Sequence, residues 1–281
     1  MLSETISSQK EKQLHDLHHN GELLILPNIW NPLGAMLLED LGYKAVATAS
    51  ASVAFSNGID DGEKISFDEL LVLLKKIVNS VKIPVTADVE SGYAANNFQL
   101  KENIKKLIDT GVSGINFEDS KHDESNLFSK EEQSEKINLI KNTASEIGSD
   151  LFINARTDIF IKENTRSKED KLAEAIERGK AYKDAGADCF YPILLKEKEG
   201  IETIIKEVSL PVNILMVNGI PHFSALKEIG VARISLGPAF LKYVLNSMKN
   251  ISEKLLKYEG MEEITRNPVT SDYLKNLIIK K

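Results

Sequence analysis

Short β-rich segments alternate with helical segments along almost the whole chain. In the helical segment 67–81, for example, Leu70, Leu74 and Ile77 recur close to a period of 3.6 residues, which is the spacing of one buried helix face. Eight consecutive units of one strand and one helix predict an α/β protein, and such a repeat favours the (β/α)8 (TIM) barrel. The eight predicted strands are 23–29, 44–50, 84–90, 114–119, 151–156, 189–194, 211–217 and 233–237.

Cap residues mark where several predicted helices begin. Ser66, Ser129 and Ser167 each precede acidic residues, a pattern typical of helix N-caps. An open, doubly wound sheet is the alternative arrangement for the same alternation of elements. No G-x-G-x-x-G sequence follows the first predicted strand, which weakens the case for a dinucleotide-binding sheet, and we therefore prefer the barrel.

The size of the chain fits one barrel domain with an added helical segment. With 281 residues and 42% hydrophobic content, the chain can bury one barrel-sized core, and we interpret 1–281 as a single domain. Residues 238–281 exceed the length of one barrel helix. We therefore predict a C-terminal helical tail that packs on a neighbouring subunit of a homo-oligomer.

Charge and cysteine content argue against several classes of protein. The net charge of −7, with basic residues interspersed among acidic ones, argues against a nucleic-acid partner. No apolar run is long enough for a membrane span, and residues 1–20 form a polar leader without an apolar signal core. The single cysteine, Cys189, cannot form an internal disulfide and is interpreted as a buried core thiol. These features predict a cytoplasmic protein.

Three of the predicted strands end in charged side chains. Asp88 and Glu90 end the third strand, Glu118 lies near the end of the fourth, and Arg156 closes the fifth. Because side chains alternate along a strand, these residues lie opposite the apolar set and are expected to face the barrel axis. The carboxyl ends of barrel strands surround one mouth, so the four side chains should lie near one another there. Carboxylates beside a guanidinium predict a site for a metal ion and an anionic substrate.

The carboxylates at this mouth need compensation, because burying several of them together is costly without a cation or hydrogen bonds. Oxygen ligands suit a hard divalent ion such as Mg²⁺, with Mn²⁺ as the alternative, and no His/Cys cluster indicates zinc. Two structural interpretations stay open. Each acid could instead cap the helix that follows it, and Arg156 could be a structural ion-pair partner.

Seven short motifs occur together in this chain: Asp88-Val-Glu-Ser-Gly, Phe117-Glu-Asp, Asn154-Ala-Arg-Thr-Asp, Pro27-Asn-Ile-Trp-Asn with Ala35, Ala47-Thr-Ala-Ser-Ala-Ser, Asp60-Asp-Gly-Glu and Val231-Ala-Arg-Ile-Ser-Leu-Gly. In combination they resemble the isocitrate lyase/phosphoenolpyruvate mutase superfamily, over residues 23–237. The resemblance implies a (β/α)8 barrel that uses Mg²⁺ and acts on small α-oxo acids. It also implies a homotetramer with exchanged C-terminal helices.

The same resemblance implies a metal site of four carboxylates. Asp88 would bind Mg²⁺ directly, and Asp61, Glu90 and Glu118 would hold the ion largely through water molecules.

Substrate contacts are implied in the same way. Arg156 would bind the substrate carboxylate with its planar guanidinium. The backbone at Ser50, Ala51 and Ser52 would hold the carboxylate and the oxo group. Trp30 is a further candidate for substrate contact, with plain packing as the alternative.

One loop departs from the pattern of the family. Its lyases carry a Lys-Lys-Cys-Gly-His-like motif after the fourth strand, whose cysteine acts as acid and base, whereas the interval 120–128 here is shorter and lacks cysteine. Lys121 and His122 are therefore the candidate catalytic residues of this loop. Lys121 and Asn126 could replace the lysine and asparagine of the mutases, and His122 could titrate near neutral pH or be a solvated loop residue.

A second departure concerns substrate size. The lyases place a glutamate after the proline of the sixth strand, but Ile193 follows Pro192 here, which argues against tricarboxylate substrates.

These observations predict a Mg²⁺-dependent enzyme that acts on a small α-oxo or 2-hydroxy carboxylate through an enolate. A carbon–carbon lyase or decarboxylase is the first hypothesis. A phosphoenolpyruvate/phosphonopyruvate mutase or hydrolase, acting at a P–C bond, is the second. A barrel that binds an oxo acid without turnover is the third. A Schiff-base aldolase needs a lysine inside the barrel, and none of the predicted inward positions is lysine.

Overall fold

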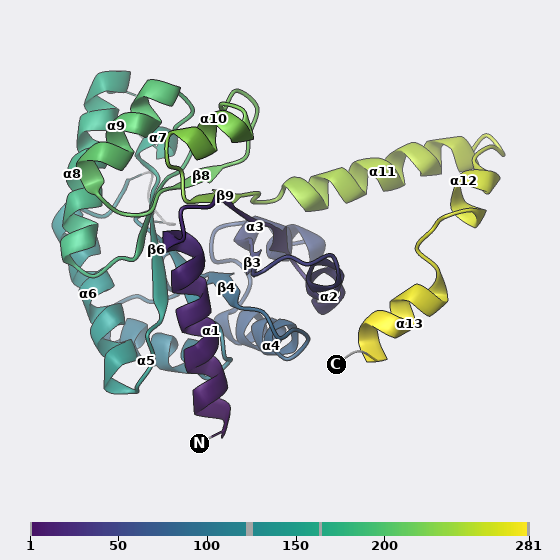
Figure 1. Cartoon of the computed structure of the whole chain (residues 1–281), viewed down its shortest axis with the longest axis horizontal. Helices are drawn as coiled ribbons and strands as arrows, with labels where there is room; N and C mark the ends of the chain where they lie inside the picture. Colours follow the sequence, from purple (N-terminus) through teal and green to yellow (C-terminus); the bar gives the residue numbers. More distant parts are fainter. Residues whose placement is uncertain (1, 122–125, 163–164, 280–281) are drawn as a thin grey trace.

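The computed structural model describes residues 2–121, 126–162 and 165–279. Within these residues strands and helices alternate as predicted (Figure 1). The strands are β1 (Leu24–Leu26), β2 (Asn28–Ile29), β3 (Val46–Thr48), β4 (Val85–Asp88), β5 (Gly114–Glu118), β6 (Phe152–Thr157), β7 (Cys189–Pro192), β8 (Asn213–Leu215) and β9 (Arg233–Ser235). The helices are α1 (Leu2–His19), α2 (Pro32–Asp40), α3 (Ser50–Ser56), α4 (Phe67–Val78), α5 (Asn97–Ile108), α6 (Lys130–Glu146), α7 (Ile159–Lys162), α8 (Lys168–Asp184), α9 (Lys198–Val208), α10 (Phe223–Glu228), α11 (Ala239–Leu255), α12 (Met261–Thr265) and α13 (Ser271–Ile279).

The strands pair in parallel and close a barrel. Strands β2 to β7 pair in sequence order, and β1, β9 and β8 form a second row. Pro27 divides one continuous segment into β1 and β2. The first part, β1, pairs with β9, and the second part, β2, pairs with β3. A parallel bridge between Phe190 and Val212 joins β7 to β8 and completes the ring. The eight predicted strands and the (β/α)8 fold are thus confirmed, with the first strand in two parts.

The outer faces of the strands pack against the surrounding helices. Val85, Ile115 and Ile153 are buried in one cluster with Leu74 of α4 and Ile140 of α6. Burying each of these side chains contributes roughly 1.5–3 kcal/mol. This apolar layer leaves the inward-facing strand positions free for polar residues.

Serine side chains begin three helices at the predicted positions. Ser66 and Ser129 each form a capping box with the glutamate three residues later, and the Ser167 hydroxyl accepts a hydrogen bond from the N–H of Asp170. These caps satisfy N–H groups that the first helical turn leaves without partners.

Helix α1 packs against the amino end of the barrel, which corrects the prediction of a polar leader in this segment (Figure 1). Leu14 is fully buried against Leu26, Phe152 and Cys189. A Cβ at Gly114 would lie 2.9 Å from a Leu14 methyl group, so the first residue of β5 must be small. Amphipathic burial of one helix face explains why a largely polar segment is helical.

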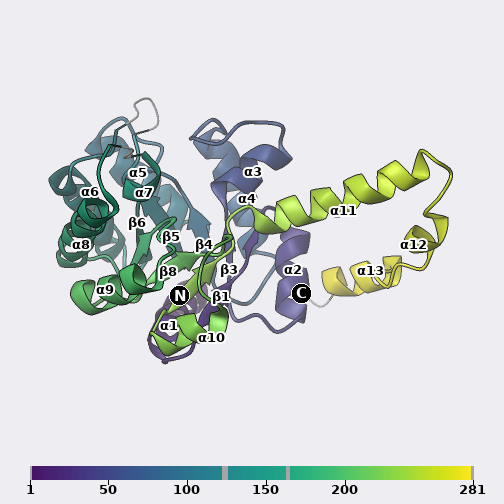
Figure 2. The same ribbon diagram turned by 90° about the horizontal axis from the view of Figure 1, so that it is seen from above.

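The C-terminal tail consists of α11, α12 and α13 and extends away from the barrel (Figures 1 and 2). Its end returns to α2, where the Tyr273 hydroxyl donates to Asp40 at 3.2 Å. Large apolar side chains along the tail are exposed, including Tyr243 at 73%, Met248 at 57% and Leu256 at 83%. The three helices within residues 239–279 agree with the predicted helical tail, and its packing on a neighbouring subunit stays a prediction.

None of the helices in the described ranges is both long and apolar enough to cross a membrane.

Candidate active site

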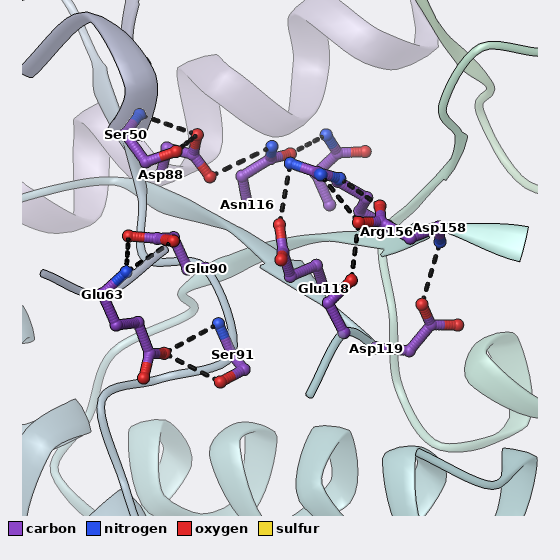
Figure 3. Close-up of polar contacts among 12 residues, drawn as sticks. Ser50, Glu63, Asp88, Glu90, Ser91, Asn116, Glu118, Asp119, Arg156 and Asp158 are labelled. Carbon is purple, nitrogen blue, oxygen red and sulfur yellow. Dashed lines mark hydrogen bonds and ion pairs between the residues drawn. The ribbon is translucent and has the colours of Figure 1, made fainter. Parts of the chain in front are cut away.

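Asp88 ends β4 and is held by groups from three other strands and helices (Figure 3). Its N–H donates to Thr48 Oγ1 at 2.9 Å, and its Oδ2 accepts from the N–H and the hydroxyl of Ser50 at 2.9 and 3.0 Å. Asn116 Nδ2 donates to Asp88 Oδ1 at 3.4 Å, and Asn154 donates to Asn116. The shared inward face predicted for Asp88, Asn116 and Asn154 is confirmed by these contacts.

Glu90 and Glu63 fasten two loops of the mouth to each other (Figure 3). Both carboxylate oxygens of Glu90 accept from the Glu63 N–H at 2.9 Å, and Glu63 Oε1 accepts from the N–H groups of Ser91 and Tyr93 at 3.1 and 2.9 Å. Glu90 adopts a left-handed backbone conformation with φ of 50°. Burial and the nearby Asp88 carboxylate raise the pKa of Glu90 to about 8. Two acids of the mouth therefore repel each other.

Arg156 lies between two buried carboxylates. Its Nη1 is 2.7 Å from Glu118 Oε2, while Nε and Nη2 donate to the Asp158 oxygens at 2.6 and 2.9 Å. Burial raises the pKa of Glu118 well above its usual value, although Arg156 opposes this shift. Burial would also raise the pKa of Asp158, but the Arg156 charge and hydrogen bonds lower it overall. A guanidinium has five N–H donors and these contacts engage three, so two can face a ligand.

A second set of hydrogen bonds, centred on Asp119, fixes the position of Asp158. Asp119, which is fully buried, accepts from the Asp158 N–H at 2.9 Å. The Tyr182 hydroxyl and Arg178 Nη1, both from α8, donate to Asp119 Oδ2 at 2.8 and 3.1 Å. Ser120 donates to Asp158 Oδ2 at 2.6 Å. The orientation of Arg156 thus depends on α8 as well as on its own strand.

Asp61 lies half-buried in the loop between α3 and α4. Burial and the Asp88 charge raise the pKa of Asp61. Among the described residues, its buried Oδ1 has no hydrogen-bond partner. Burial, and to a smaller extent the Asp88 charge, also raises the pKa of Glu90 and of Glu118.

The four predicted metal ligands do not converge on one point. Within residues 2–121, 126–162 and 165–279, no group of three or more His, Cys, Asp or Glu side chains is arranged to hold a metal ion. Glu90 instead binds the Glu63 backbone, and Glu118 pairs with Arg156. Their role as metal ligands stays a prediction.

The predicted substrate-binding residues occupy two different places. Ser50, Ala51 and Ser52 form the first turn of α3 beside Asp88, and Ser52 is fully buried. Trp30 lines an apolar cavity of about 240 Å³ between α2 and α11, together with Phe240. Its contact with substrate stays a prediction.

The loop after β5 brings Lys121 and Asn126 together. The Lys121 N–H donates to the Asn126 carbonyl at 3.1 Å, and Lys162 Nζ donates to the Lys121 carbonyl at 2.7 Å. These three residues and Arg166 line a cavity of about 420 Å³. His122, the other predicted catalytic residue of this loop, lies outside the described residues.

Comparison with known proteins decides the family. Residues 14–256 match the model of the phosphoenolpyruvate phosphomutase family. The chain belongs to this family. It is therefore an enzyme of the isocitrate lyase/phosphoenolpyruvate mutase superfamily, as its motifs indicated.

Proteins that are similar to this chain carry different functional names. A candidate phosphonomutase from Burkholderia cenocepacia J2315, known from its crystal structure, is 34% identical in sequence to this chain. The two structures superpose with a TM-score of 0.84 over 88% of this chain and 98% of the phosphonomutase chain. An uncharacterised protein of Mycobacterium tuberculosis is 31% identical over 79% of this chain and 81% of its own length. Oxaloacetate decarboxylase 2 of Pseudomonas fluorescens is 26% identical over 90% of this chain and 88% of its own length.

Several residues of the site could not be assigned from the sequence. Glu63 and Asp158 stood inside motifs that resemble the family, so their positions carried a signal. Arg178 and Tyr182 lie one helical turn apart on α8, and nothing in their sequence context linked them to Asp119. Only the folded structure joins these side chains.

Proposed function

We propose that this chain is a Mg²⁺-dependent enzyme that acts on a small α-oxo or 2-hydroxy carboxylate through an enolate. The reaction we favour is carbon–carbon bond cleavage or decarboxylation. One observation carries this proposal: the Arg156 guanidinium is fixed beside buried carboxylates at the mouth of the barrel, and it retains donors for an anionic ligand.

The donor set at the mouth suits Mg²⁺. Asp61 Oδ1 is buried without a hydrogen-bond partner among the described residues, and the pKa of Glu90 is raised by burial and by Asp88. A cation there would relieve this repulsion. Mg²⁺ keeps several water ligands and needs only one or two protein carboxylates, so a ready-made cage of three is not required. Asp88 would hold the ion, with Asp61, Glu90 and Glu118 around its water molecules, and Mn²⁺ is the alternative ion.

The chain's own residues would bind and orient the substrate. Bound Mg²⁺ supplies positive charge that stabilises the negative charge developing on the substrate's 2-oxygen. Arg156 holds the carboxylate, and Glu118 and Asp158 fix the plane of its guanidinium. Ala51 and Ser52, in the first turn of α3, would add backbone N–H donors. Ile193 after Pro192 leaves no charged partner at that position for a third carboxylate, which favours short substrates.

Product analysis tests this proposal most directly. Oxaloacetate, substituted malates, methylisocitrate and phosphonopyruvate should be incubated with the protein and Mg²⁺, and the products followed by mass spectrometry. We expect turnover of a short dicarboxylate that stops on chelation of the metal. Metal-dependent binding of oxalate without any product would instead favour a barrel that binds oxo acids without turnover.

A phosphoenolpyruvate/phosphonopyruvate mutase or hydrolase is the second candidate. It is favoured by the cationic cavity that Lys121 shares with Asn126 and Lys162, because a phosphonate needs additional cationic or amide contacts. Replacing Lys121 and Asn126 by alanine distinguishes the two reactions. A mutase should lose nearly all activity, whereas a decarboxylase that uses other groups should keep most of it.

We further propose that the enzyme is a homo-oligomer, a tetramer by resemblance, assembled through its tail. The exposed apolar side chains of α11 and α12, such as Met248 and Met261, support this proposal. Light scattering on the full chain should give the mass of a tetramer, and charged substitutions at Met248 and Met261 should lower it. The mass of a single chain for the unaltered protein would contradict the proposal.

A further inference from the structure

Tyr191 occupies an inward position at the same level of the barrel as the substrate-binding arginine. In the pairing of β6 with β7, Tyr191 lies directly opposite Arg156, and Cys189 lies opposite Asn154. Adjacent strands are about 4.8 Å apart. Tyr191 is 3% exposed. We therefore expect a carboxylate bound to Arg156 to lie close to the phenol ring of the neighbouring strand.

Four charged residues act on the pKa of Tyr191 through their electrostatic fields. Burial raises the pKa of Tyr191 above its usual value, Arg156 and Arg233 oppose this shift, and Asp88 and Asp158 reinforce it. Burial therefore favours the phenol as the resting form, while the charges of Arg156 and Arg233 favour the phenolate.

Arg233 supplies an independent observation. It is fully buried inside the barrel, and its Nε donates to Ser235 at 3.0 Å. Its Nη1 has no hydrogen-bond partner within the described part of the chain. Leaving a buried charged donor without an acceptor is costly. A negative oxygen within reach of this Nη1, such as a Tyr191 phenolate, would supply the acceptor that it lacks.

Three other candidate proton donors, one cysteine and two lysines, lie elsewhere. Cys189, the only cysteine, is buried in the cluster under α1, and burial raises its pKa to about 12. Lys121 lies over the Phe128 ring, 5.2 Å from its centroid, in the loop after β5. Lys136 Nζ lies over the same ring, 3.2 Å from its centroid. Of these groups, only Tyr191 shares a level of the barrel with Arg156.

We propose that Tyr191 is the catalytic acid that protonates the enolate carbon, taking the place of the loop cysteine of the lyases. The electron pair of the enolate C=C bond takes the phenolic proton, so that an O–H bond breaks, a C–H bond forms and the α-oxo acid is produced. The negative charge passes to the phenolate, which the charges of Arg156 and Arg233 favour. A proton from water entering the mouth restores the phenol. This inference rests on the enolate reaction proposed above.

Exchange of pyruvate protons tests the assignment, because the reverse of the proposed step is removal of a methyl proton by the Tyr191 phenolate, and return of a solvent-derived proton from the phenol completes one exchange. Full-length protein with Mg²⁺ and pyruvate in D₂O is followed by proton NMR, which records loss of the methyl signal. We expect Tyr191→Phe to slow this exchange by about 100-fold or more, the usual scale of general acid–base catalysis. Mg²⁺-dependent oxalate affinity, measured by calorimetry, should change less than about threefold, because a phenyl ring retains the packing. Tyr43→Phe, remote from the mouth, is the matched control and should leave both unchanged.

The outcomes separate this inference from the proposed function. Exchange that survives in Tyr191→Phe, or oxalate affinity that falls together with exchange, would overturn the acid role. Wild-type protein that binds oxalate with Mg²⁺ but exchanges no pyruvate protons would overturn this inference while leaving the binding site intact. Wild-type protein that neither binds oxalate nor exchanges protons would overturn both proposals.

Discussion

The two ends of the barrel interior are built from opposite kinds of side chain. At the amino end, Leu14, Phe152 and Cys189 form an apolar cluster that α1 covers. At the carboxyl end, Asp88 and Glu118 lie with Arg156 in a buried network of charges. Apolar burial stabilises the fold, whereas buried like charges oppose it unless partners compensate. We infer that the amino end supplies stability and the mouth supplies binding.

The largest expected effect on stability comes from Phe152→Ala. This change removes a fully buried ring from under α1 and should lower the free energy of unfolding by about 3–5 kcal/mol. Urea denaturation measures the loss, and oxalate affinity should stay within about threefold. Phe98→Ala, at a position 77% exposed on α5, is the matched control and should cost less than about 0.5 kcal/mol. If Phe152→Ala were equally mild, the amino end would not be the stabilising region.

The pH dependence of stability sharpens the same comparison. Burial lowers the pKa of His18 to about 3, from a usual value of about 6.5. In this pH range His18 therefore binds a proton in the unfolded chain but not in the folded chain. His18 thus destabilises the fold as pH falls from about 6.5 towards 3. The slope is about 1.4 kcal/mol per pH unit, or about 2 kcal/mol by pH 5.

His18→Gln should remove this part of the acid sensitivity in urea titrations at pH 7.5 and pH 5. His222→Gln, at an exposed position, should leave the difference between the two pH values unchanged. An unaltered pH difference in His18→Gln would show that α1 does not hold a neutral histidine.

The smallest expected effect on stability comes from Tyr182→Phe, on helix α8. Tyr182→Phe removes a hydrogen bond to the buried Asp119 carboxylate and should cost about 1.5 kcal/mol in unfolding free energy. Because Asp119 holds the Asp158 backbone, and Asp158 orients Arg156, oxalate affinity should also fall, unlike in Phe152→Ala. Tyr258→Phe, at a 99% exposed position, is the control. A loss of stability with unchanged affinity would uncouple α8 from the site.

Local sequence signals predicted the strands, the main helix caps and the mouth residues. Ser66 and Ser129 act through neighbours three residues away, so their roles are visible in the sequence. The position of Arg156 at a strand end was visible for the same reason.

Contacts between distant segments could not be predicted in this way. A strand pattern places Glu90 and Glu118 at the mouth, but it does not say where their oxygens point, and Glu90 binds the Glu63 backbone. Helix α1 was missed because a mostly polar segment becomes a barrel cover only when Leu14 meets Phe152 and Cys189. The α8 contacts to Asp119 depend equally on tertiary packing.

Calorimetric titration of oxalate in the presence of Mg²⁺ tests the central claim most directly. Asp88→Asn keeps the size of the side chain and removes its charge, and Asp60→Asn does the same at an exposed neighbour that pairs with Lys64. We expect wild-type protein and Asp60→Asn to bind oxalate only with Mg²⁺, and Asp88→Asn to lose about 100-fold or more in affinity, equal to about 2.7 kcal/mol. Equal Mg²⁺-dependent affinity in all three proteins would contradict a metal site at the mouth of the barrel.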